Sequence, residues 1–318
     1  MNNILKKIYP LVALIIFISL IFYYYNKNQT DFYFVNNISL NLLFKIIFLS
    51  LLYLITEGFI LRNIVNFLGK KISIMESFLV MNFTYFCNTF IQFTGLGFRV
   101  YYIKKTKGIG VKKFIRFSLD TIACEIFIFS FLGLISLLFV DLTSLEINLS
   151  KFLYLIFVIF FFISLIYLIL LPKIIYLILN VFNKIGLKKL NNLFEIFLYK
   201  NITSKSLYFK QCKIFILQFL ILFLIFFLIL KDFELSNFFY LSLMTTSLVD
   251  FSFLLAFTPY SVGITEVITF FGTRDVNFTI AEIIVLINLF RLCMLSIYFL
   301  VGPIFFIIFL LRNKKNGM

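Results

Sequence analysis

The sequence contains no histidine and no tryptophan, and only 14% of its 318 residues are charged. Without histidine the chain lacks the most common general base and a frequent zinc ligand, which argues against histidine-dependent catalysis and zinc sites. The four cysteines (Cys87, Cys124, Cys212 and Cys293) are scattered without a CxxC pair, so we expect free thiols with no redox role. We therefore expect no metal site, no cofactor and no enzymatic activity, although a transferase activity stays open as an alternative.

Long hydrophobic runs dominate what is present. Hydrophobic residues make up 62% of the chain and the mean hydropathy is +1.07, values typical of an all-α polytopic membrane protein. We expect residues 1–318 to form a single membrane domain. The net charge of +15 comes from lysines between the apolar segments, so anionic lipid headgroups and membrane lipids are the expected partners, and nucleic acid is not.

Charged residues divide the chain into eight hydrophobic segments, near 8–25, 40–61, 76–97, 115–140, 152–171, 211–231, 236–258 and 279–311. Lys6 and Lys7 favour a cytoplasmic N-terminus. If every segment crossed the membrane, the 98–116 loop would lie outside, yet it carries seven basic residues and no acid. Basic loops favour the cytoplasm, so we predict that 76–97 is a re-entrant hairpin with two short arms.

The same argument applies near the C-terminus, where Arg312, Lys314 and Lys315 favour the cytoplasm. A second re-entrant hairpin at 236–258, entering from outside and followed by the outer loop 259–278, satisfies this preference. The prediction is six full spans plus two re-entrant hairpins, with both termini on the cytoplasmic side of the cytoplasmic membrane. The halves, about 1–145 and 146–318, form an inverted repeat, and 173–210 is a cytoplasmic loop with an interfacial helix.

One interruption stands out, the stretch FTPYSVGITE at residues 257–266. Pro259 and Gly263 should break a helix there, and broken helices at membrane depth line protein or a cavity. Gly263 lies 166 positions after Gly97, and the same offset takes Glu125 to Arg291, which is a change of charge sign. The offset supports the predicted repeat.

Ionisable residues within the apolar segments are costly and usually face a partner or a wet cavity. They are Asp120, Glu125, Asp250, Glu266, Glu282 and Arg291. Arg291 is expected to pair with Glu125, Asp120 or Glu266, either as a structural ion pair or as part of a headgroup site. Glu57, close to Arg62, is expected at the cytoplasmic interface.

Arg99 follows the TGLG turn formed by Gly95 and Gly97, at the expected start of a new helix. An arginine beside free N–H groups at a helix start suits a phosphate, while the alternative is an arginine that only anchors the interface. Both hairpins carry polar side chains, which satisfy broken backbone, line a path for a headgroup, or do both. They are Asn82, Thr84, Asn88, Thr89, Gln92 and Thr94 in the first and Thr245, Thr246, Ser247 and Asp250 in the second.

Two stretches carry a family resemblance, GLGFRVYYIKKTKGIGVKKFIRFSLD (95–120) and PYSVGITEVITFFGTRDVNFTIAEIIVLINLFR (259–291). They resemble the lysylphosphatidylglycerol synthase transmembrane-region family, which includes the flippase-like half of multiple peptide resistance factors. Tyr260 and Ser261 stand where the family favours glycines, and the usual proline before Gly95 is missing. The sequence has no acyltransferase domain, so aminoacyl transfer is not expected.

The resemblance implies flippase-like translocation of an anionic phospholipid or an isoprenoid-phosphate lipid. Arg99, Glu266 and Arg291 are expected to line a central site, with Asp120, Glu125, Asp250, Asn88 and Gln92 as further substrate-binding residues. One alternative is a membrane-embedded transferase, or an accessory subunit, acting on lipid-linked sugars. A third is a proton-coupled small-solute transporter that relays protons through Asp250 and Glu266.

Overall fold

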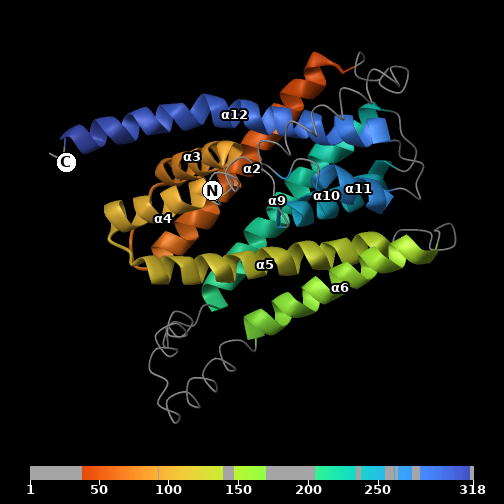
Figure 1. Ribbon diagram of the computed structural model, residues 1–318, viewed down its shortest axis with the longest axis horizontal. Coiled ribbons are helices and arrows are strands. Elements are labelled where there is room, and N and C mark those ends of the chain that lie inside the picture. The colour runs from red at the N-terminus through yellow and green to blue at the C-terminus, as the bar shows by residue number, and fades with distance from the viewer. Residues whose placement is uncertain are drawn as a thin grey trace, which may run out of the picture.

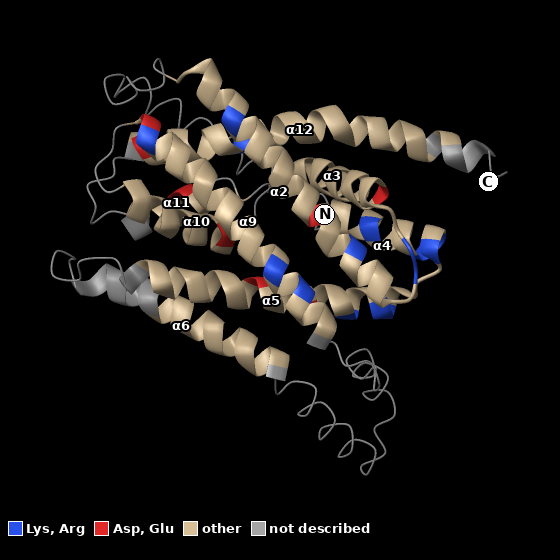
Figure 2. Ribbon diagram, turned by 180° about the vertical axis from the view of Figure 1, so that it is seen from behind, with Lys and Arg blue, Asp and Glu red and all other residues tan. Residues whose placement is uncertain are grey.

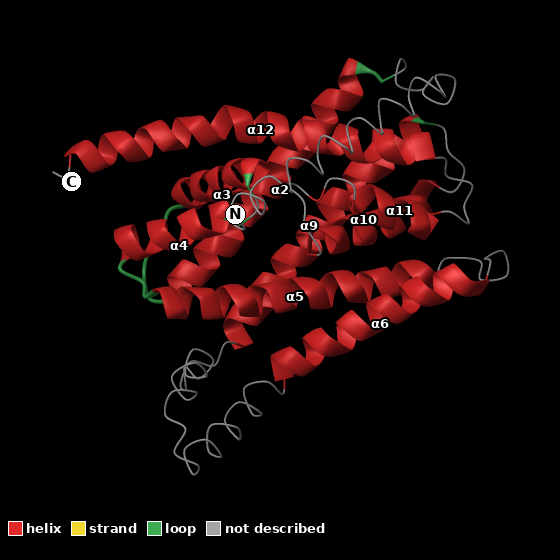
Figure 3. Cartoon of the chain, in the orientation of Figure 1, coloured by secondary structure: helices red, strands yellow, loops and turns green. Residues whose placement is uncertain are grey.

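The computed structural model describes residues 38–91, 93–138, 147–169, 205–233, 238–254, 261, 264–273 and 280–315. Every regular element within these ranges is a helix (Figure 3). The described helices are α2 (Leu40–Phe67), α3 (Ile74–Phe90), α4 (Thr94–Lys107), α5 (Val111–Leu138), α6 (Ile147–Ile169), α9 (Lys205–Asp232), α10 (Phe238–Leu254), α11 (Ile264–Thr273) and α12 (Ile280–Lys315). The prediction of an all-α membrane protein is confirmed.

Within the described ranges, four helices are long and apolar enough to cross a membrane: Leu40–Phe67, Val111–Ser136, Ser206–Asp232 and Ala281–Phe309. They correspond to the predicted spans 40–61, 115–140, 211–231 and 279–311. The predicted span 152–171 falls on α6, whose apolar part Leu155–Leu168 is shorter. The predicted span 8–25 and the interfacial helix after residue 173 lie outside the described residues.

The first helical hairpin is longer than predicted. Its arms are α3, with 17 residues, and α4, with 14, and they pack against each other. The prediction that both arms lie within 76–97 is wrong, because the helix continues to Lys107. It can do so because Lys104, Lys105 and Lys107 sit in its last turn, where cations favour the negative end of the helix dipole.

The turn of this hairpin depends on close backbone packing. Phe93 adopts a left-handed φ of 68° just before α4 starts. The backbone N–H of Gly95 donates to Asn88 Oδ1 at 2.8 Å, and a Cβ on Gly95 would lie 1.9 Å from the carbonyl oxygen of Thr84. Only glycine therefore fits where α4 crosses α3. Gly97, in contrast, faces open space.

The second hairpin consists of α10 and α11, which also pack together. The prediction of a single hairpin segment at 236–258 followed by a loop at 259–278 is wrong, because residues 264–273 form α11. These ten residues have one strongly apolar face. They are too few for a membrane span, so a search for apolar runs of span length does not find them. The helices end and begin on either side of the predicted interruption, but Pro259 and Gly263 themselves lie outside the described residues.

The helices pack in two matching sets. The first set is α2, α3, α4 and α5, and the second set, which comes after α6, is α9, α10, α11 and α12. In this order, each helix of the second set begins 165, 164, 170 and 169 positions after its counterpart in the first. α3 packs on α12, while its counterpart α10 packs on α5. α2 contacts α3, α5 and α12, while α9 contacts α10, α12 and α5. α2 and α9 lie side by side and run in opposite directions. α5 and α12 also run in opposite directions (Figure 1).

One large apolar core joins these sets. It includes Leu54 and Leu61 of α2, Leu222 and Phe226 of α9 and Phe290 of α12, all at most 1% exposed. The first hairpin is held on α12 by aromatic rings, among them Phe83 with Phe306 in a stack at 5.5 Å. The hairpin that carries Arg99 is therefore fixed against the long α12.

Candidate functional site

Arg99 lies in the second turn of α4, on a hairpin arm fixed by the Asn88 and Gly95 contacts. Its Nη1 donates to the sulfur of Met81 at 3.3 Å, and its Nε is buried with no hydrogen-bond partner among the described residues. Thioether sulfur is a weak acceptor, and a guanidinium has five N–H donors. Arg99 therefore has donors available for an anion.

A cavity of about 140 Å³ lies beside this arginine, between α2, α3, α4, α5 and α9. Its polar wall consists of Glu57, Tyr85, Arg99, Ser118, Thr121 and Glu125, and its apolar wall of Ile60, Leu61, Ile64, Ile122 and Phe215. Tyr85, Arg99 and Glu125 are partly exposed, which indicates that the cavity opens to the surface. A few convergent polar groups on an apolar wall are typical of a ligand site.

Glu57 forms the inner end of this cavity. Its side chain is in the interior, with 6% of the residue exposed. Gln218 of α9 donates to Glu57 Oε1 at 2.9 Å, and the Tyr85 hydroxyl also donates to this carboxylate. Glu57 is therefore buried among the helices, where these two donors offset the cost of burying it. Its position at the cytoplasmic membrane interface stays a prediction.

Two further acidic residues, Glu125 and Asp250, interact electrostatically with Glu57. Glu125 of α5 interacts electrostatically with Arg99, Glu57 and Asp250. Asp250 of α10 is 2% exposed, and its Oδ2 has no hydrogen-bond partner among the described residues. None of the three carboxylates is within ion-pair distance of Arg99 in the part of the chain that the structure describes, which leaves room between them and the guanidinium.

A second polar group lies between the other hairpin and the last helix. Arg291 of α12 forms a buried ion pair with Glu266 of α11, and its Nη2 donates to the carbonyl oxygen of Ser261 at 2.9 Å. Ser252 of α10 donates to Thr265, which reaches the same Ser261 carbonyl at 3.1 Å. Of the three expected partners of Arg291, the structure selects Glu266.

Asp120 belongs to a third group, on the side of α5 that faces α6 and α9. Arg116 Nη2 is 3.3 Å from Asp120 Oδ1, one helical turn away. Tyr167 of α6 and Tyr208 of α9 donate to the two oxygens of Asp120 at 3.2 and 3.1 Å. Asp120 thus ties three helices together, and its carboxylate oxygens are already occupied.

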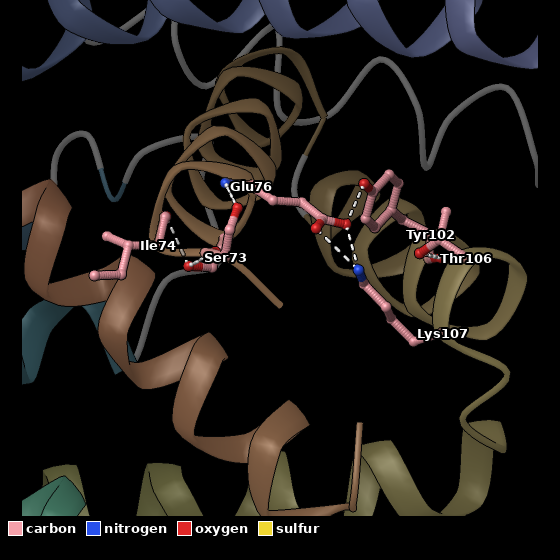
Figure 4. A network of polar contacts seen from close by, with 7 residues as sticks. Ser73, Ile74, Glu76, Tyr102, Thr106 and Lys107 are labelled. Atoms are coloured by element: carbon pink, nitrogen blue, oxygen red, sulfur yellow. Dashed lines mark hydrogen bonds and ion pairs between the residues drawn. The ribbon is translucent and has the colours of Figure 1, made fainter. Parts of the chain in front are cut away.

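The ends of the first hairpin are tied to each other. Glu76 at the start of α3 accepts from Tyr102 at 2.9 Å and pairs with Lys107 Nζ at 2.7 Å, so that the two arms meet (Figure 4). Ser73 caps α3 by accepting from the backbone N–H of Glu76. Lysines and arginines gather at this end of the molecule, on α4 and the start of α5 (Figure 2).

The structure thus divides the sequence-predicted residues. Arg99 and Glu125 line one cavity, and Asp250 interacts electrostatically with Glu125. Glu266 and Arg291 form their own pair, and Asp120 lies in the α5 network. Asn88 supports the hairpin turn, and Gln92 lies outside the described residues. Sequence reasoning missed Glu57, Tyr85 and Gln218, although an acid and a glutamine inside apolar segments were signals for two of them.

Comparison with known proteins gives one match. Residues 5–302 match the family described as the lysylphosphatidylglycerol synthase TM region, which covers most of the chain. Neither the curated proteins nor the solved structures contain a significant match. Within the described residues, no group of three histidine, cysteine, aspartate or glutamate side chains has the arrangement of a metal site.

Proposed function

We propose that this chain, which belongs to the lysylphosphatidylglycerol synthase transmembrane-region family, is a flippase-like transporter. Its cargo is an anionic phospholipid or an isoprenoid-phosphate lipid, and the membrane it serves is the cytoplasmic membrane. The observation that carries the proposal is Arg99, whose guanidinium borders a polar cavity and keeps donors without strong acceptors.

The chemistry of the cavity suits a phosphate headgroup. A guanidinium binds phosphate through two parallel charge-assisted hydrogen bonds, which are stronger than neutral ones. Ser118 and Thr121 line the same space from α5, and their hydroxyls donate to the carbonyl oxygens of Phe114 and Phe117 in that helix. The apolar wall of Ile60, Ile64 and Ile122 offers a surface for the first part of an acyl or isoprenoid chain.

The paired packing of the two helix sets supports an inverted repeat and alternating access. Counterpart helices that run in opposite directions are related by an axis in the membrane plane, which is the arrangement of many secondary transporters. In this proposal, α3 and α4 form one re-entrant gate and α10 and α11 the other. Relative motion of the two hairpins then exposes the cavity to each side in turn.

The distribution of charge supports an orientation. The basic end of the molecule, with Lys104, Lys105 and Lys107 on α4, faces the cytoplasm in this proposal because cytoplasmic segments carry excess lysine and arginine. Both chain termini then lie on that side.

A liposome assay tests the proposal. Purified full-length protein is reconstituted with a fluorescent phosphatidylglycerol or a labelled isoprenyl phosphate, and lipid exposed on the outer leaflet is followed over time. Arg99→Ala should lower the initial rate at least about tenfold, because the charge-assisted contacts to phosphate are lost. Arg99→Lys should retain an intermediate rate, because lysine keeps the positive charge but cannot donate two parallel hydrogen bonds to one phosphate.

Lys105→Ala is the matched control. Lys105 lies on the same helix and is exposed, and its Nζ donates a hydrogen bond to the Tyr101 hydroxyl at 3.1 Å. This variant should transport both lipids at close to the wild-type rate. If Arg99→Ala also transported at the wild-type rate, the assignment of the headgroup site to Arg99 would fail.

A further inference from the structure

We infer that Glu57, Glu125 and Asp250 form a proton-binding site, and that the cavity takes up a proton when a phosphate headgroup binds Arg99. The first half of this inference concerns the empty protein and stands alone. The second half rests on the proposed function. Together they name the ion that is transported with the lipid.

Three carboxyl groups from three helices act on one another. Glu57 comes from α2, Glu125 from α5 and Asp250 from α10, and each interacts electrostatically with at least one of the others. Glu57 and Asp250 are 6% and 2% exposed, so water screens their charges poorly. The unpartnered Oδ2 of Asp250 is the position where a proton can be held without breaking a hydrogen bond.

The groups around the three carboxyls do not balance their charge. They are the guanidinium of Arg99 from α4, the hydroxyls of Tyr53 from α2 and Tyr85 from α3, the amide of Gln218 from α9 and the thiol of Cys124 from α5. Among the described residues, Arg99 is the single cation in this set. Carboxylates that share a buried site cannot all ionise, because each disfavours the charge of the others. At least one of the three therefore carries a proton.

Anion binding changes this balance. A phosphate that pairs with Arg99 offsets the charge that stabilised the remaining carboxylate, so the site gains a proton from water as the lipid enters. The new O–H group can donate to a phosphate oxygen, which a carboxylate cannot do. When the headgroup leaves, the proton leaves with it. Binding of lipid and of proton are thus linked, and each tightens the other by the same factor.

The arrangement differs from a relay through Asp250 and Glu266. Glu266 is paired with Arg291, and this pair belongs to the other hairpin. The titratable groups near Asp250 are Glu57, Glu125 and Tyr53 instead. The protons are thus placed beside the cavity of Arg99.

Infrared difference spectroscopy tests the first half without any lipid substrate. Full-length wild-type protein in nanodiscs at neutral pH should show the C=O stretch of a protonated carboxyl. Glu57→Gln, Glu125→Gln or Asp250→Asn should each keep the side-chain volume, and at least one should lose this band. Glu76→Gln is the control, because Glu76 is partly exposed and paired with Lys107, and this variant should keep the band. An identical band in all four variants, or no band in the wild type, would overturn the proton site.

Proton uptake on binding tests the second half. Dihexanoyl phosphatidic acid is added to the wild-type nanodiscs in weakly buffered solution with a pH indicator, and protein-free nanodiscs correct for protons released by the lipid. We expect uptake of about one proton per bound lipid, and affinity that falls up to about tenfold per pH unit as pH rises.

The outcomes separate the two proposals. Binding with no proton uptake and no pH dependence would overturn the coupling and leave the flippase proposal intact. Absence of binding would overturn both the headgroup site and the coupling. The infrared result decides the proton site in either case.

Discussion

Arg291 of α12 and Glu266 of α11 form an ion pair in the interior, where their side chains are 3% and 7% exposed. Arg99 of α4 faces the acid Glu125 of α5 across the cavity, so the two halves place opposite charges on the second hairpin arm and on the following long helix. In the second half, the two charged side chains are in direct contact as an ion pair. In the first half the charges stay apart and leave a cavity between them.

The ion pair between Arg291 and Glu266 should be important for the stability of the protein. Glu266→Gln or Arg291→Gln should each destabilise the protein by about 3–5 kcal/mol, because each leaves an uncompensated charge in the interior. The double variant should lose less than the sum of the two. Thermal unfolding in detergent measures all three, with the exposed neighbour Leu292→Ala as control. Additive losses would show that the two residues are not coupled.

Gly95 and Gly97 lie at the start of α4 and not in the hairpin turn predicted for them, and their substitutions should have opposite effects on stability. Gly95→Ala should destabilise the hairpin by about 1–3 kcal/mol or more, because its Cβ would lie 1.9 Å from the Thr84 carbonyl oxygen. Gly97→Ala should be neutral or stabilising by up to about 1 kcal/mol, since its Cβ meets open space within a helix. Unfolding midpoints of the two variants provide the comparison. Equal losses would contradict the close packing at Gly95.

The Asp120 network should hold α6 to α5. Tyr167→Phe removes the donor to Asp120 Oδ1 at 3.2 Å and should cost about 0.5–1.5 kcal/mol. Tyr208→Phe removes the donor to Oδ2 at 3.1 Å and should cost a similar amount. Chemical unfolding of each variant gives the free energy. Tyr101→Phe, at an exposed position on α4, is the control, and a loss no greater than this control would argue against the network.

The ion pair between Lys107 and Glu76 should contribute less to the stability of the protein than the ion pair between Arg291 and Glu266. Its side chains are 16% and 19% exposed, so water screens the interaction. Lys107→Met should destabilise the protein by about 1 kcal/mol or less, with an effect that shrinks as salt is added. Unfolding at low and high salt checks both points. A loss as large as that of Arg291→Gln would contradict this ranking.

The comparison of sequence with structure follows particular residues. The apolar runs located α2, α5, α9 and α12, because a membrane span needs about 20 apolar residues and leaves a clear signal. Hairpin arms such as α4 and α11 are short and carry charged or polar residues, so the same signal marked their limits poorly. The burial of Glu57 was not predicted, because its distance along the chain from Arg62 says nothing about Gln218, which lies 161 residues later.

Composition and the order of apolar and basic segments determined the class of protein and the main spans, because bilayer thickness sets the length of an apolar span. Tertiary structure decided which charges meet. Three acids could have paired with Arg291, and only packing of α11 on α12 selected Glu266. The same packing left Arg99 beside a cavity with Glu57, Glu125 and Asp250 nearby, since contacts between distant helices depend on their crossing and not on their sequence spacing.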